Sequence, residues 1–225
     1  MVHEVHEILE EAEEGHLTNA EALEEIEHLL DDHAHDDHDD HGDEHAHDHG
    51  IYDPHVWLDP VLAQHQVETI RDGLVDADPD NAAAYMANAE SYLHELEDLH
   101  DQYVTTLADC RHDTIVTFHS AFAYLVERYD LKVESLTGLD GADAISTADL
   151  IELADFINDN NIDYILTEFG VDQRNFEVIA EETNTTVLTL SPVEGISQED
   201  VDSGATYISK MMENLGVLKT ALDCN

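Results

Sequence analysis

The chain of 225 residues has a mass of 25.2 kDa, which is enough for one or two domains with an apolar core. Its 54 acidic side chains against 7 Lys plus Arg give a formal net charge of −47, which repels nucleic acid and anionic membrane surfaces and attracts cations. Because 42% of the residues are apolar and recur periodically, the chain is not a disordered acidic tail. The acidic excess resembles the surface of a salt-adapted protein. We therefore predict a fold that needs molar salt, at which a Debye length of about 3 Å screens carboxylate repulsion.

The first fifty residues divide into two segments of different composition. Thr18 and Glu21 have the spacing of a capping box and precede an apolar stripe, so residues 1–30 are predicted to form an exposed helical segment. Residues 31–50 form an acidic tract without large apolar side chains, for which we predict no regular structure. The tract is predicted to capture cations weakly through seven histidines: His33, His35, His38, His41, His45, His47 and His49. The alternative is a solvated linker without a role.

Two Asp-Pro pairs mark the helices that follow. Asp59-Pro60 and Asp78-Pro79 each place an N-cap residue before a proline at the first helical position. Residues 51–80 thus contain a first helix, and apolar side chains at helical spacing predict a second across residues 81–110. A helix of thirty residues is about 45 Å long, which is more than one small domain needs. We therefore interpret the second helix as a connector between two lobes.

The pattern changes after Cys110 to alternating strands and helices. Strands are predicted at residues 114–118, 131–135, 162–167 and 186–190, and helices at residues 121–129, 146–160, 175–182 and from Ser197 onwards. Such alternation is typical of a parallel sheet covered on both faces, and it assigns residues 111–225 to one α/β lobe. Ligands of such sheets bind at the carboxyl ends of the strands.

Two histidines occupy positions suited to metal binding. His119 directly follows the strand at residues 114–118, and His55 lies in the sequence DPHVWLDP, a rigid turn that enters a helix. Each of them could equally be a packed structural residue. No hydrolytic motif accompanies them, because His94-Glu95 is followed by Asp98 where a second zinc ligand would stand, so we predict no enzyme.

Cys110 and Cys224 are the two cysteines of the chain and fit no zinc-ribbon spacing. Their positions alone leave two alternatives open, which are free buried thiols and a disulfide.

Three segments carry a resemblance to a known family. DPHVWLDP, the helix NAAAYMANAESYLHELEDL and IVTFHSAFAYLVERYDL occur in the order seen in the zinc and manganese solute-binding proteins of ABC uptake systems, the ZnuA-like or cluster 9 proteins. The resemblance covers about residues 51–225. An acidic, His-rich loop just before DPHVW is typical of the zinc-specific members, and the tract of residues 31–50 stands in that place.

The resemblance implies a fold class and a ligand set. The fold is α/β with two lobes, a long connecting helix and a parallel sheet in the C-terminal lobe. His55 is the ligand from the N-terminal lobe, His119 the ligand from the C-terminal lobe, and Glu194 a nearby carboxylate after the last strand. Glu168 matches a glutamate that is usually structural. A disulfide between Cys110 and Cys224 is also favoured, because family members are exported and carry cysteines near both places.

The N-terminal lobe is expected to be incomplete. Family members carry about a hundred residues before DPHVW, including a signal peptide, the first strands and a further ligand histidine, whereas this chain has fifty. His3, His6, His16 and His28 lie outside the family motif, so no first ligand is assigned. The start of the chain does not read as a signal peptide.

The resemblance predicts a zinc-binding component of an ABC importer. It would deliver Zn²⁺, in preference to Mn²⁺, to a membrane permease and its ATPase from an extracytoplasmic position. It would contact the membrane through the permease or a missing anchor, and the incomplete lobe would favour a homodimer. The alternative is a His-rich metal buffer or storage protein whose folded part is an inactive truncated remnant.

Overall fold

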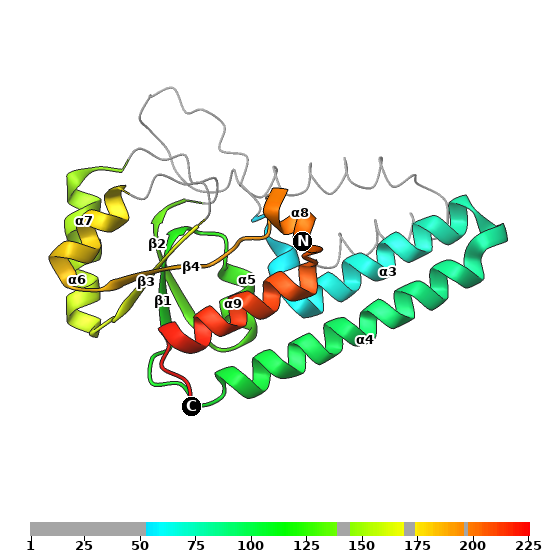
Figure 1. Ribbon diagram of the computed structural model, residues 1–225, viewed down its shortest axis with the longest axis horizontal. Helices are drawn as coiled ribbons and strands as arrows, with labels where there is room; N and C mark the ends of the chain where they lie inside the picture. The colour runs from blue at the N-terminus through cyan, green and yellow to red at the C-terminus, as the bar shows by residue number, and fades with distance from the viewer. Residues whose placement is uncertain (1–52, 139–144, 169–173, 196–197) are drawn as a thin grey trace, which may run out of the picture. The chain divides into compact units, whose positions relative to one another are not determined.

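The computed structural model describes residues 53–138, 145–168, 174–195 and 198–225 (Figure 1). The predicted helix of residues 1–30, the tract of residues 31–50 and Ser197 lie outside the described residues. The proposed division into lobes at residues 80 and 110 stays a prediction.

The first described elements begin as their Asp-Pro pair predicts. A short 3₁₀ turn, η2 (Val56–Leu58), leads into helix α3 (Pro60–Ala77). The Asp59 carboxylate accepts hydrogen bonds from the amides of Val61 and Leu62, so it satisfies two of the free N–H groups at the helix start. The predicted N-cap at Asp59 is confirmed.

The second Asp-Pro pair also marks a helix start, without a side-chain cap bond. A 3₁₀ turn, η3 (Pro79–Asn81), precedes helix α4 (Ala82–Leu107), and Asp78 makes no capping bond to the backbone. Its carboxylate instead accepts from Asn81 Nδ2 at 2.7 Å and Tyr85 Oη at 2.9 Å. Asp78 thus stands at the predicted N-cap position with Pro79 at the first helical position, but the helix starts as a 3₁₀ turn and becomes α-helical three residues later.

Helices α3 and α4 run side by side, as Figure 1 shows. The 26 residues of α4 span about 39 Å at 1.5 Å per residue. One face of α4 supplies buried side chains to the core, among them Leu96, Leu99 and Tyr103. The predicted long helix is confirmed over most of residues 81–110.

The predicted parallel sheet is confirmed. Its four strands pair in parallel in the order β2-β1-β3-β4. The strands are β1 (Thr114–His119), β2 (Lys132–Thr137), β3 (Tyr164–Thr167) and β4 (Thr186–Thr189). The helices between them are α5 (Ala123–Arg128), α6 (Thr147–Asn160) and α7 (Arg174–Thr183). All four strands therefore end at the same edge of the sheet.

Both faces of the sheet are covered. Neighbouring residues of one strand point to opposite faces, so Ile115 and Val116 of β1 enter different core clusters. Ile115 packs in the cluster that includes residues of α4, α5 and α9. Val116 packs in the cluster that includes residues of α6 and α7. The apolar run of β1 follows from this double burial.

The predicted single last helix is wrong. Two helices occupy this part of the chain, α8 (Gln198–Ser203) and α9 (Tyr207–Ala221). Gly204 between them has φ +74°, a left-handed conformation that ends α8, and Thr206 forms a capping box with Ser209 that starts α9.

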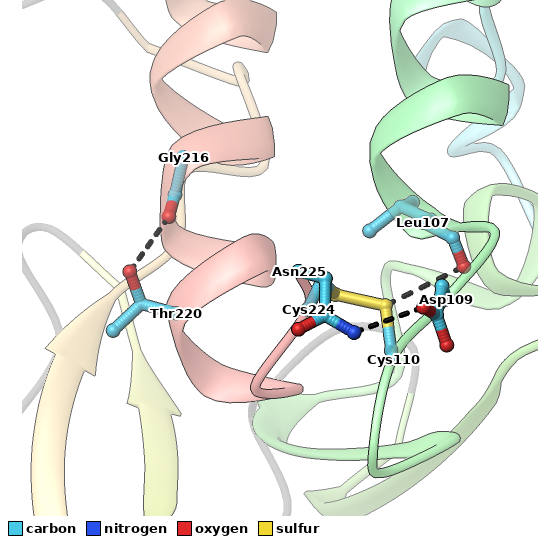
Figure 2. The surroundings of a disulfide bond; sticks show 7 residues. All are labelled: Leu107, Asp109, Cys110, Gly216, Thr220, Cys224 and Asn225. Carbon is cyan, nitrogen blue, oxygen red and sulfur yellow. Dashed lines mark hydrogen bonds between the residues drawn. A yellow bond between two sulfur atoms is a disulfide. The ribbon is translucent and has the colours of Figure 1, made fainter.

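A disulfide joins Cys110 to Cys224, so neither cysteine is free. Figure 2 shows that it links the segment after α4 to the C-terminal end of the chain. Asn225 Nδ2 donates to Asp109 Oδ2 at 2.9 Å beside it. The end of the long helix is thereby fastened to the residues that follow α9.

Within the described ranges, every helix is too short or too polar to cross a lipid bilayer.

Candidate metal centre

His119 is the last residue of β1 and is 5% exposed. Its Nδ1 lies 2.5 Å from Oε1 of Glu168, which directly follows β3 and is 4% exposed. Because β1 and β3 are parallel neighbours, their carboxyl ends bring these two side chains together. The buried carboxylate fixes the ring of His119 and directs its Nε2 away from Glu168.

His55 is held in a similar way by the residues before α3. It is 2% exposed, and its Nδ1 lies 2.6 Å from Oδ1 of Asp53. The same carboxylate oxygen accepts a hydrogen bond from the His55 backbone amide at 2.9 Å, which closes a local turn. A carboxylate on Nδ1 leaves Nε2 as the ring nitrogen of each histidine that can bind an ion.

The third member of the group comes from the loop after β4. Glu194 Oε1 lies 2.9 Å from His55 Nε2, and the Glu194 side chain is 46% exposed. The ring centroids of His55 and His119 are 5.3 Å apart. One ligand atom from each of these three residues lies within 4.8 Å of the others, which is the one such group found in the described part of the chain.

These distances suit a small divalent ion. Ligands at 2.0–2.2 Å from a tetrahedral zinc ion are about 3.3 Å apart, so the three atoms need only small side-chain rotations to reach an ion between them. The predicted candidates His55, His119 and Glu194, from three segments distant in sequence, are thus brought together. The seven histidines of residues 31–50 lie outside the described residues.

Opposing effects set the pKa of His119. Burial is the largest and lowers the pKa, because it disfavours the charged imidazolium. The hydrogen bond to Glu168 and the negative charges of Glu168, Glu194 and Asp53 act in the opposite direction and together outweigh it. The pKa of His119 is therefore raised above 6.5, and an incoming cation competes with a proton for this ring.

Sequence reasoning missed the role of Asp53. It was named only as part of a rigid turn, although an aspartate two residues before a candidate histidine is a recognisable signal for an Asx-type turn that orients the ring. Glu168 was predicted to be structural, and its contact with His119 is a positioning contact of this kind.

Two oriented imidazoles and a carboxylate thus form a candidate metal centre at the carboxyl edge of the parallel sheet of an α/β protein. The chain belongs to the ZnuA family: residues 2–221 match the family model described as zinc-uptake complex component A, periplasmic. Proteins of this family bind a substrate and do not catalyse a reaction, so the prediction that the chain is not an enzyme is confirmed.

Two characterised relatives carry zinc in their names. The high-affinity zinc uptake system protein ZnuA of Bacillus subtilis is 36% identical over 170 residues, which cover 76% of this chain and 53% of that protein. The zinc-binding lipoprotein AdcA of Streptococcus pneumoniae is 37% identical over 183 residues, which cover 79% of this chain and 36% of that protein. The chain thus spans about half the length, or less, of these relatives.

A solved structure agrees with the fold. The crystal structure of the Zn(II)-bound ZnuA-like domain of Streptococcus pneumoniae AdcA superposes with a TM-score of 0.68 at 36% identity. The match covers 81% of this chain and 68% of that domain. The predicted fold class and family are confirmed.

Proposed function

We propose that the chain is the zinc-binding component of an ABC uptake system, which holds Zn²⁺ between His55, His119 and Glu194. It would deliver the ion to a membrane permease powered by an ATPase. The observation that carries this proposal is the convergence of the three ligand atoms within 4.8 Å, with a carboxylate behind each imidazole. The zinc named in the relatives supports the same ion here.

The ligand chemistry favours zinc over manganese. Neutral imidazole suits zinc, copper, iron and nickel, whereas manganese prefers carboxylate, carbonyl and water oxygens. Two of the three ligands are imidazoles, and one is a carboxylate. Mn²⁺ should therefore bind more weakly than Zn²⁺ at the same site.

The site combines tight holding with a route of release. His55 and His119 are buried, Glu194 is 46% exposed, and the three ligands found among the described residues leave the fourth position of a tetrahedral ion to water or to a further ligand. Structural zinc sites use four protein ligands and are closed. A half-exposed carboxylate among the ligands suits a protein that must hand over its ion.

An extracytoplasmic location fits the disulfide, because Cys110–Cys224 would persist in an oxidising compartment. The periplasmic description of the family points the same way. A homodimer would cover the apolar side chains of α3 and α4 that face solvent, of which Ile70 is 62% and Met86 57% exposed.

The test is a zinc titration with a competing chelator of known affinity. Substitution His119→Ala should weaken zinc binding at least about a hundredfold, because it removes a ligand and leaves Glu168 buried without its partner. His94→Ala is the matched control, since His94 is 73% exposed on α4 and should bind zinc like the unmodified chain. Unchanged tight binding by His119→Ala would overturn the ligand assignment.

The second candidate function is a metal buffer, favoured by the seven histidines of residues 31–50. Deletion of residues 31–49 separates the two functions. An importer component retains tight binding of one zinc ion per chain after the deletion. A buffer loses its weak, multivalent binding and has no tight site left.

A further inference from the structure

Trp57 stands between two segments that supply ligands. It lies two residues after His55, and the centroids of the two rings are 5.4 Å apart. Its indole Nε1 donates a hydrogen bond of 2.8 Å to the carbonyl oxygen of Pro192, two residues before Glu194. The side chain therefore contacts one ligand and the loop of another, which are 139 residues apart in sequence.

The loop that carries Glu194 has an unfavourable backbone conformation. Val193 has φ +56°, in the left-handed region that a β-branched residue rarely adopts. Such a conformation persists only where the surrounding structure holds it. The residue that follows it in the chain is Glu194, so this turn sets the direction from which the carboxylate approaches His55.

Two anchors hold the loop before Val193. Buried Asn214 of α9 donates from Nδ2 to the Ser191 carbonyl at 2.7 Å and accepts from the Ser191 amide at 2.8 Å. The indole of Trp57 is the second anchor, at Pro192. Trp57 is itself fixed, because Tyr207 Oη donates to its carbonyl oxygen at 2.6 Å. The loop is thus fastened to α9 at one residue and to the His55 turn at the next.

We propose that Trp57 is a positioning residue for the metal centre: its indole N–H holds the Pro192–Val193 turn so that Glu194 faces His55. The inference rests on the proposed function, since it assigns Trp57 a role through Glu194 as a zinc ligand. Without the hydrogen bond, the half-exposed Glu194 side chain turns toward water and zinc loses its carboxylate.

The test is a double-mutant cycle on the full chain with Trp57→Phe and Glu194→Gln, measured by competition for Zn²⁺ with a chelator. Trp57→Phe should weaken zinc binding about tenfold, in the range typical of groups that orient a ligand. In the Glu194→Gln background the same substitution should change affinity less than about twofold, because the ligand it positions has already been lost. Benzothienylalanine at position 57 keeps the shape of tryptophan without its N–H, and it should reproduce the effect without altering the packing.

Tyr124→Phe is the matched control. Tyr124 Oη donates to the Asp53 carbonyl at 3.2 Å, so its loss removes a bond to the same turn but none to the loop of Glu194. Its effect on zinc affinity should be equal in both backgrounds. The absorption spectrum of the Co²⁺-loaded chain gives a second readout, and Trp57→Phe and Glu194→Gln should change it in the same way.

The outcomes separate the two proposals. If Glu194→Gln weakens zinc binding while the Trp57 effect is the same in both backgrounds, Trp57 is only a packing residue and the inference is wrong. If Glu194→Gln leaves zinc affinity unchanged, the proposed ligand set itself is wrong and the inference is overturned with it. The positioning role is supported if the benzothienylalanine variant and Trp57→Phe lose the same amount of zinc affinity, and if neither loses any in the Glu194→Gln background.

Discussion

The substitution Glu168→Gln isolates the electrostatic part of the support behind His119. Glutamine has nearly the shape of glutamate, and its amide oxygen still accepts a hydrogen bond from Nδ1, so the ring keeps its orientation. The negative charge is lost. We expect a chain that folds normally and binds zinc more weakly.

The structure sets the size of this effect. The side chains of His119 and Glu168 are 7% and 6% exposed, so water screens their 2.5 Å contact little. A hydrogen bond to a charged group contributes about 1.5–3 kcal/mol, and a neutral one about 0.5–1.5 kcal/mol. The difference of about 1–1.5 kcal/mol corresponds to roughly a tenfold loss of zinc affinity. Glu168→Ala, which removes the bond as well, should approach a hundredfold.

The pH dependence of zinc affinity tests the contact between Glu168 and His119 independently. The charge of Glu168 helps to raise the pKa of His119, so at low pH the unmodified chain must displace a proton to bind zinc. Glu168→Gln lowers this pKa and therefore reduces the proton competition. The tenfold difference in zinc affinity between the unmodified chain and Glu168→Gln should be largest near pH 8 and should become smaller as the pH falls below about 6.5.

A chelator competition assay between about pH 5.5 and pH 8 measures both quantities. Glu177→Gln is a suitable control, because Glu177 is an exposed glutamate of α7 outside the candidate metal group. Zinc affinity equal to that of the unmodified chain at every pH would refute the positioning role of Glu168. A deficit that is constant with pH would refute its effect on the proton affinity of His119.

Three further predictions concern stability. Arg128→Ala should lower the free energy of unfolding in urea by about 2–3 kcal/mol, because it leaves the carboxylate of Asp59, which is 2% exposed, without its ion-pair partner. The guanidinium of Arg128 donates to this carboxylate at 2.7 and 2.8 Å, and Arg128→Lys should restore part of the loss. Replacement of Cys110 and Cys224 by serine should cost up to about 5 kcal/mol, the chain-entropy value for a closed loop of this length, and an unchanged melting temperature would contradict it. The net charge of −47 predicts a fold that needs molar salt, and full circular-dichroism structure at low salt would contradict this.

Much of the fold could be predicted because its signals are local. Strands such as β1 are apolar on both faces and read as continuous runs, and Ser146 with Asp149 carries a capping box that starts α6 as expected. The placement of His119 followed from the rule that parallel sheets bind ligands at the carboxyl ends of their strands. These features depend on residues that are close together in sequence.

The rest depended on long-range partners. Asp78 stands at the predicted N-cap position, yet its carboxylate accepts from the side chain of Tyr85, seven residues later, and makes no cap bond. The start of α9 was missed because α8 and α9 together resemble one apolar-periodic segment, which the conformation of Gly204 and the capping box of Thr206 divide. That Glu194 approaches His55, 139 residues away, depends on the turn at Val193, which no sequence pattern specifies.

The attachments of the His55 turn explain how the two imidazoles come to be preorganised. Tyr124 and Arg128 of α5 donate to Asp53 and Asp59, on either side of His55, across 71 and 69 residues of sequence. Helix α5 follows closely after His119 in the chain. The helix next to His119 therefore fixes the turn that carries His55. Ligands held this way lose little conformational freedom on binding an ion, which favours affinity. Glu194 is the half-exposed member of the group, so water reaches the candidate site at this carboxylate rather than at the two buried rings.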